Sequence, residues 1–326
     1  MGINSLFIQN AIIKENCILF ACRNIFCSID IFSWEIRGKL VFEKNGVMWG
    51  VRKYRDDILI YSNGLAGYYL FDSNNNSLSF KEIKKITKYL TAFVYDDKII
   101  FIPYNTSDEL IIIDKDEKEI ASAKWNEEII NKCSDFEIYK WNYKDGILTL
   151  VLKNSNKILI YEIENDEVEI LDTIFQGKVE DAFVLQDNLY FIDESGKRFC
   201  IYSIKNKKLE HEGWTKGGLY KKILIANEDI FISTETELVK YDKFEEKVVY
   251  NFTRKFEGSA FLTALEKENK SFILPWLDDS FIEIDDHDGV KAHQIPLKRI
   301  LLTLNKINED YVKLIDFLKY IEEVTL

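Results

Sequence analysis

The chain of 326 residues carries short apolar runs that recur at a nearly constant interval. Each run follows a polar turn, as in "DDILIYS", "DKIIFIP" and "DNLYFID". The runs are rich in β-branched and aromatic residues, which is typical of strands. Their aligned positions are Ile18, Ile58, Ile99, Ile147, Leu189, Ile230 and Ser271. The successive spacings of 40, 41, 48, 42, 41 and 41 residues predict a structural repeat of about 41 residues.

Three further strands are predicted around each run. One precedes it, as in "EDAFVLQD", and one follows a later turn, as in "KLEHEGW". Between these, a second apolar stretch ends at Asp, Glu or Ser, and Asp in particular starts hairpin turns by bonding to the backbone two residues on. These end positions are Asp72, Asp114, Glu162, Ser203, Asp242 and Asp285. Each repeat therefore predicts four antiparallel strands.

Seven such repeats resemble β-propeller proteins as a broad group, over residues 3–304 or so. The resemblance implies an all-β fold, a seven-bladed β-propeller of four-stranded antiparallel blades that occupies residues 1–304. The alternative is a β-sandwich in which the even spacing of the strands arises by chance. A sandwich, however, is not expected to repeat a set of four strands every 41 residues. The Gly-His and Trp-Asp signature of WD40 repeats, the repeated double glycine of kelch repeats and the Asp-box of sialidases are missing. The resemblance therefore implies a fold and no particular activity.

Two segments depart from the repeat. The spacing of 48 places about seven extra residues around "WNEEIINKCSDFE", where a short helical turn is predicted. The tail 305–326 predicts a C-terminal amphipathic helix, packed on the propeller, with Asn308 as its N-cap. A role for this helix in binding a partner stays open. Its apolar stripe consists of Ile307, Tyr311, Leu314, Ile315, Leu318 and Ile321.

Two of the three prolines, Pro103 and Pro275, occupy equivalent positions in the third and seventh repeats. Proline is tolerated where a strand leaves the ladder, so both predict the end of a second strand. The loops that follow second strands share one face in propellers of similar architecture. Aromatic and Arg side chains there suit stacking on a sugar, base or peptide side chain. The candidate partner face, which could equally be an ordinary rim, consists of Arg23, Asn63, Tyr104, Leu152, Glu194, Glu235 and Trp276.

Composition narrows the classes of partner. The chain is 47% hydrophobic and 30% charged, which is typical of a globular protein, and its formal net charge is −12. Without a dense basic stretch interleaved with aromatics, nucleic acid is not an expected partner. No apolar run approaches the length of a membrane span, and the first residues lack a signal-peptide pattern, so we expect a cytoplasmic protein. Abundant Ile, Lys and Asn indicate an AT-rich bacterial genome.

No motif for catalysis or for a cofactor is found, so the catalytic residues are unknown and no cofactor is expected. Acidic residues are too numerous for a pair of glycosidase carboxylates to be picked out. The spacing of the first three cysteines does not suit zinc, so we expect no metal and no disulfide there, and the histidines are interpreted as outer-strand or turn residues. The residues concerned are Cys17, Cys22, Cys27, His211, His287 and His293.

The sequence favours a non-enzymatic binding scaffold that presents a propeller loop face to a protein, peptide or glycan partner. The alternative is a propeller enzyme, a hydrolase or lyase, that acts on a carbohydrate or small metabolite with carboxylates near the central channel. A third hypothesis is a structural subunit recruited through the C-terminal helix. Buried carboxylates with shifted pKa values would favour the enzyme.

Overall fold

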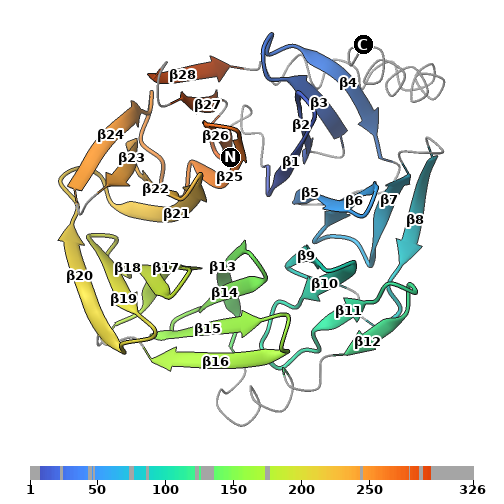
Figure 1. Cartoon of the computed structure of the whole chain (residues 1–326), viewed down its shortest axis with the longest axis horizontal. Coiled ribbons are helices and arrows are strands. Elements are labelled where there is room, and N and C mark those ends of the chain that lie inside the picture. Colours follow the sequence, from blue (N-terminus) through green and yellow to red (C-terminus); the bar gives the residue numbers. More distant parts are fainter. Residues whose placement is uncertain are drawn as a thin grey trace. The chain divides into compact units, whose positions relative to one another are not determined.

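The computed structural model describes residues 8–22, 25–42, 46, 48–72, 77–85, 88–121, 125, 136–172, 177–242, 245–278, 280–285 and 289–294. The fold is all-β, a seven-bladed β-propeller of four-stranded antiparallel blades, whose strands are labelled in Figure 1. The blades are numbered here in chain order. The chain divides into two compact units, Met1–Asp97 with Phe261–Leu326, and Lys98–Ala260.

The first unit holds blades 1, 2 and 7 and the first strand of blade 3. Blade 1 consists of β1 (Ala11–Lys14), β2 (Cys17–Cys22), β3 (Ile25–Asp30) and β4 (Ile36–Val41). Blade 2 consists of β5 (Trp49–Tyr54), β6 (Asp57–Ser62), β7 (Gly67–Asp72) and β8 (Ser77–Glu82), and β9 (Thr91–Tyr95) follows. Blade 7 consists of β25 (Phe261–Lys267), β26 (Lys270–Pro275), β27 (Ser280–Asp285) and β28 (Gly289–Gln294).

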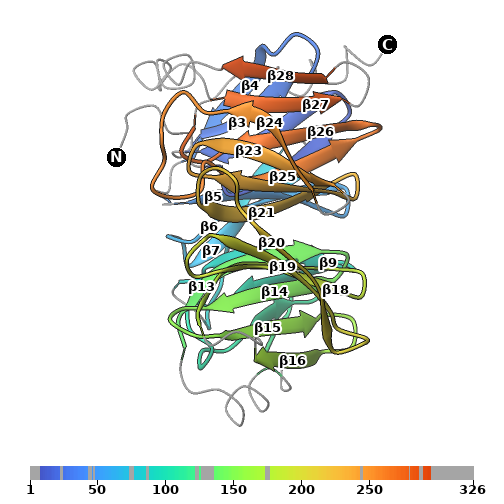
Figure 2. The same cartoon turned by 90° about the vertical axis from the view of Figure 1, so that its left-hand side faces the viewer.

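The second unit begins with β10 (Lys98–Ile102), β11 (Ile111–Ile113) and β12 (Glu119–Ala121) of blade 3. Blade 4 consists of β13 (Ile138–Lys144), β14 (Ile147–Leu152), β15 (Lys157–Glu162) and β16 (Glu167–Asp172), the last three of which run side by side in Figure 2. Blade 5 consists of β17 (Val179–Leu185), β18 (Asn188–Asp193), β19 (Arg198–Ser203) and β20 (Lys208–Trp214). Blade 6 consists of β21 (Tyr220–Ala226), β22 (Asp229–Thr234), β23 (Glu237–Asp242) and β24 (Glu245–Asn251).

Burial within a blade follows strand order, and this explains the sequence pattern. Second strands such as β6 and β14 are buried at nearly every position, because neighbouring strands and neighbouring blades cover both of their faces. Fourth strands such as β8 and β20 alternate between exposed and half-buried residues. The continuous apolar runs of the sequence are therefore second strands, and the polar alternating segments are outer strands.

Tight hairpins join the first and second strands. Their polar turn residues adopt positive φ, as at Arg55 (55°), Gln186 (54°) and Asn227 (49°). Two-residue turns with positive φ match the twist of the flanking strands, and polar residues tolerate this conformation better than β-branched ones. The polar turn that precedes each apolar run in the sequence is this hairpin.

In the first unit, the first and last blades of the chain pack on each other. The backbone N–H of Ile8 donates a hydrogen bond to the carbonyl oxygen of Pro275 (3.4 Å). Phe20 of blade 1 lies with its ring centroid 5.6 Å from that of Phe281 in blade 7, inside one shared hydrophobic cluster. Trp34 also stacks on His293, with centroids 3.8 Å apart. Residues near the two ends of the described chain thus form one core.

Three sequence predictions concern the connections between these elements. Pro103 directly follows β10 and Pro275 ends β26, as expected for the ends of second strands. The predicted helix at 305–326 lies outside the described residues, as does the predicted helical turn at residues 127–130. Trp125, just before that turn, is fully buried and donates a hydrogen bond from Nε1 to the carbonyl oxygen of Asp108 (3.3 Å).

Candidate functional site

The first strands of blades 4, 5, 6 and 7 share one irregularity near their starts. A β-bulge interrupts the pairing between Ile138 and Lys140, and the same interruption recurs 41 residues later in each following blade, in β17, β21 and β25. A bulge leaves one residue out of the ladder and redirects side chains. In the second unit the residues left out of the ladder are Tyr139, Glu180 and Lys221.

Below these bulges lies a buried polar cluster formed by Asn142, Asp181 and Lys222. The Lys222 ammonium donates to Asn142 Oδ1 (2.8 Å), to the carbonyl oxygen of Trp141 (3.0 Å) and to Asp181 Oδ1 (3.3 Å). The Asp181 side chain is fully buried and also accepts from the backbone N–H of Ile223 (2.7 Å). Burial lowers the pKa of Lys222, and the charge of Asp181 opposes that shift. The cluster ties the first strands of three blades together.

Nearer to solvent lies a second set, which we name the charged corner: Tyr139, Lys140, Glu180, Lys221, Glu235 and Lys255. The Lys140 ammonium contacts Glu180 Oε1 (2.5 Å) and donates to the carbonyl oxygen of Lys221 (2.6 Å). Glu235 pairs with Lys255 (2.8 Å) and Lys221 (3.6 Å). Each charge in the corner therefore has an opposite charge or a carbonyl dipole beside it.

The electrostatics of the charged corner keep Glu235 ionised and Tyr139 protonated. The hydrogen bond from Lys255 lowers the pKa of Glu235 most, and the charges of Lys221 and Lys255 add to the effect. Burial raises the pKa of Tyr139, as does the charge of Glu180. Glu235 is therefore a carboxylate at neutral pH, whereas Tyr139 keeps its phenolic proton and can donate it in a hydrogen bond. With three lysines and two glutamates, the corner carries a local surplus of one positive charge.

The structure places the residues of the predicted partner face as follows. In the second unit, Tyr104 is half-buried, with its carbonyl oxygen bonded to the N–H of Ile138 (2.7 Å). Glu194 is exposed and pairs with Lys178 (3.2 Å), and the N–H groups of Glu194 and Glu235 donate to carbonyl oxygens just before β17 and β21. Leu152, the last residue of β14, is buried.

In the first unit, Trp276 is half-buried, whereas Asn63 is buried and its Oδ1 accepts the N–H of Met48 (3.1 Å). Arg23 lies outside the described residues. The use of this face by a partner stays a prediction. Of the predicted face, only Glu235 is a member of the charged corner.

The sequence did carry a signal for the buried polar cluster and for its neighbour in the charged corner. Lys140, Asp181 and Lys222 occur at intervals of 41 residues, the period of the repeat. Charged residues of alternating sign at one repeat position indicate first strands of neighbouring blades that face each other with opposite charge. The predicted repeat is defined by apolar positions, and the charged positions with the same period do not belong to that set.

Other expectations concern metals, thiols and membranes. Cys17 is half-buried, and Cys22 and Cys27 are buried. Within the described ranges, no group of three or more His, Cys, Asp or Glu side chains is arranged to hold a metal ion, and no helix is long and apolar enough to cross a bilayer. His211 and His293 lie in outer strands, as expected, but each is half-buried and hydrogen-bonded, to Tyr241 (2.5 Å) and Glu283 (2.9 Å) respectively.

No protein-family model matches the chain, and no curated protein sequence matches it. Solved structures do resemble it. A catalytically inactive virginiamycin B lyase from Staphylococcus aureus, solved with quinupristin, superposes with a TM-score of 0.62 at 9% identity, over 85% of this chain and 94% of that one. Kluyveromyces lactis Hsv2 superposes with a TM-score of 0.56 at 11% identity, over 89% and 98% of the two chains.

PorZ, a surface component of the type-IX secretion system of Porphyromonas gingivalis, gives a TM-score of 0.59 at 12% identity, over 90% of this chain and 39% of that one. Likenesses at these identities concern the fold alone. They agree with the seven four-stranded blades, and the expected resemblance to β-propeller proteins is confirmed.

Proposed function

We propose that this chain is a non-enzymatic binding scaffold, and that the charged corner holds a protein, peptide or glycan partner that presents a carboxylate. The observation that carries the proposal is the layering of the site. The charged corner, in which Lys255 and Tyr139 are exposed, rests on the buried polar cluster, in which every donor of Lys222 has an acceptor. Such a base preorganises the groups above it, which lowers the entropic cost of binding.

Two side chains of the charged corner are suited to contact a partner directly. The side chain of Lys255 is 65% exposed, and Tyr139 is 43% exposed. Tyrosine offers a large, rigid contact area together with a hydroxyl donor, and is enriched among the residues that dominate binding energy. The surplus positive charge of the corner attracts an acidic group, although the protein as a whole carries −12. A cytoplasmic location of this scaffold is part of the proposal.

The pKa of Glu235 supports binding over acid catalysis at this corner. A general acid needs a carboxyl whose pKa is raised, whereas the lysines beside Glu235 lower its pKa. An ionised Glu235 instead holds Lys255 and Lys221 in place, so that the exposed ammonium of Lys255 can face the carboxylate of a partner.

A hydrolase or lyase that acts on a carbohydrate or small metabolite is the alternative, and one group in the second unit favours it. Burial raises the pKa of Glu246, which accepts hydrogen bonds from the Tyr220 hydroxyl and from the N–H of Lys216 (3.2 Å). A raised carboxyl pKa is the direction that a general acid needs. A virginiamycin B lyase is among the solved structures that resemble the chain, which is compatible with a lyase as this alternative. A hydrolase or lyase activity of the wild-type chain that is abolished in Glu246→Gln would support this alternative.

The binding proposal is tested with defined ligands. The purified chain is screened against a displayed peptide library and a glycan array, and the affinity of the best binder is measured by calorimetry. We expect Tyr139→Ala to weaken it about 30-fold and Lys255→Glu about 10-fold. Lys247→Glu, the same charge reversal on exposed β24, is the matched control and should change the affinity less than about 2-fold. Equal affinity for all four proteins would contradict the proposal.

A further inference from the structure

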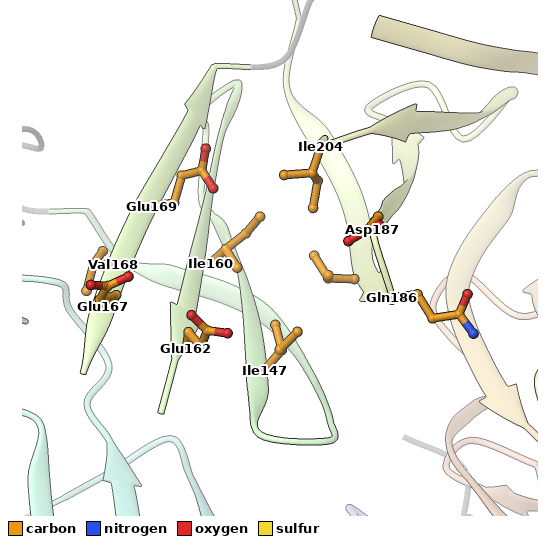
Figure 3. A pocket seen from close by; sticks show the side chains of 10 residues that line it. Ile147, Ile160, Glu162, Glu167, Val168, Glu169, Gln186, Asp187 and Ile204 are labelled. Carbon is orange, nitrogen blue, oxygen red and sulfur yellow. The ribbon is translucent and has the colours of Figure 1, made fainter. Parts of the chain in front are cut away.

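A groove of about 400 Å³ lies between blades 4 and 5, in the second unit. Figure 3 shows its position between β15 and β16 on one side and the turn from β17 to β18 on the other. Glu180 of the charged corner and Gln186 of the groove are six residues apart on extended chain, so about 20 Å separates the two sites. The groove is lined by Ile147, Ile160, Glu162, Glu167, Val168, Glu169, Val184, Gln186, Asp187 and Ile204.

The floor of the groove is apolar. Ile160 and Val184 belong to the hydrophobic cluster that joins blades 4 and 5, and Ile147 and Ile204 are half-buried at its edge. In Figure 3 the side chains of Ile147, Ile160 and Ile204 lie between the two acidic sides. The part of this floor in contact with water comes mainly from Ile147 and Ile204, because Ile160 and Val184 are buried, and an aliphatic ligand would cover it favourably.

The two sides of the groove are acidic. Blade 4 contributes Glu162, Glu167 and Glu169, and blade 5 contributes Asp187 across the floor. All four are exposed side chains, and none of the ten lining residues is basic. Negative charge on both sides of an apolar strip favours a ligand with positive charge at two points and methylene groups between them.

We infer that this groove binds an aliphatic diamine, with its methylene chain on the Ile and Val floor and its two ammonium groups at the carboxylates of the two blades. A hydrated divalent cation does not fit as well, because an apolar floor offers it no oxygen ligands. A monoamine brings an ammonium group to one side of the groove only, and a neutral aliphatic molecule brings none to either side. The volume is at the lower end of the range for small-molecule pockets, which suits a short linear ligand.

The inference is tested on the full chain by methyl NMR at low ionic strength, with 1,5-diaminopentane as the probe. We expect saturable shifts of the methyl groups of Ile147, Ile160 and Ile204, while the fully buried Ile232 in blade 6 stays unchanged. Shortening the probe to 1,3-diaminopropane should weaken binding about 2- to 4-fold per methylene removed. Pentylamine should bind at least about 3-fold more weakly, and 1,5-pentanediol should not shift these methyl groups.

Charge variants locate the two ammonium groups. Glu169→Gln and Asp187→Asn remove one charge from each side, and each should weaken the diamine about 3- to 5-fold, the upper end for exposed ion pairs. Glu257→Gln, an exposed carboxylate elsewhere in the unit, is the matched control and should bind as the wild type does. Melting temperatures verify that the variants fold. If a variant does not fold, the readout is instead the affinity of the wild-type chain for the diamine, which should fall as the salt concentration rises. Equal binding of diamine and pentylamine, shifts confined to other methyl groups, unchanged affinity in both variants, or salt-independent binding would overturn the inference.

Discussion

Replacing Lys222 with Met tests whether the buried polar cluster stabilises the second unit. Methionine keeps most of the aliphatic stem and removes the ammonium group. Asp181 would remain, fully buried, with the N–H of Ile223 at 2.7 Å and the Asn142 amide at 3.2 Å as its donors. The carbonyl oxygen of Trp141 and Asn142 Oδ1 would each lose a donor as well.

The expected loss in the free energy of unfolding follows from the polar groups that stay buried without the Lys222 ammonium. Breaking a buried ion pair by removing one partner costs about 3–5 kcal/mol, because an uncompensated charge stays in the interior. Two features place the cost of Lys222→Met near the lower end of this range. Burial already disfavours the charged form of Lys222, as its lowered pKa indicates, and two donors to Asp181 remain. We therefore expect the free energy of unfolding to fall by about 3 kcal/mol.

The assay is urea unfolding at neutral pH, followed by tryptophan fluorescence and by circular dichroism, which should give coincident transitions if unfolding is two-state. Lys247→Met, an exposed lysine, is the control and should cost less than about 0.5 kcal/mol. The double variant Lys222→Met with Asp181→Asn should be at least about 1 kcal/mol more stable than additive losses would give. A Lys222→Met protein within about 1 kcal/mol of the wild type, or strictly additive losses, would refute the reasoning.

Three further predictions follow from other residues. Trp276→Ala should weaken capture of a partner bound at the predicted face about 30-fold with an unchanged melting temperature, whereas a lowered melting temperature without a binding defect would assign Trp276 to packing. Burial lowers the pKa of His293 in the folded chain below its usual value of 6.5. Between these two pKa values the unfolded chain binds more protons than the folded chain, so the stability should fall as the pH drops through 6.5. Urea titrations at pH 7.5 and 5.5 should show that His293→Phe lacks this loss, and an identical loss in the variant would contradict it. Burial raises the pKa of Cys200 to about 12, so at pH 8 a thiol reagent should modify half-buried Cys17 well before Cys200, and peptide mass spectrometry showing equal rates would disagree.

The blade architecture was predictable because its signals are local. Hairpin turns with positive φ select polar residues, and strands covered on both faces select apolar runs, so turn and run alternate at the repeat period. The extra residues after Trp125 were recognised by the same rule, as a break in the period. Seven blades of four strands could therefore be counted without any long-range information.

The candidate site was not predictable in the same way, because its geometry depends on long-range contacts. The bulge before Lys140 changes which side chains face the interior, and no local pattern of residues predicts this bulge. Lys222 reaches the carbonyl oxygen of a residue 81 positions earlier, and only the folded first strands bring the two together. Asn63 was expected on the partner face because it follows a strand. It is buried, since its side chain satisfies the backbone N–H of Met48.

The pairing of the first blade with the last has a consequence for how the chain folds. Ile18 and Phe20 of blade 1 share a core with Phe272 and Phe281, whose strands are synthesised about 250 residues later. Until blade 7 leaves the ribosome, this apolar face has no partner, and closing so long a loop slows the step at which it is buried. The nascent chain therefore exposes a hydrophobic edge through most of its synthesis, at which a chaperone would act. Refolding of the full chain should be limited by the docking of blade 7, and fragments that end before Phe261 should aggregate through blade 1.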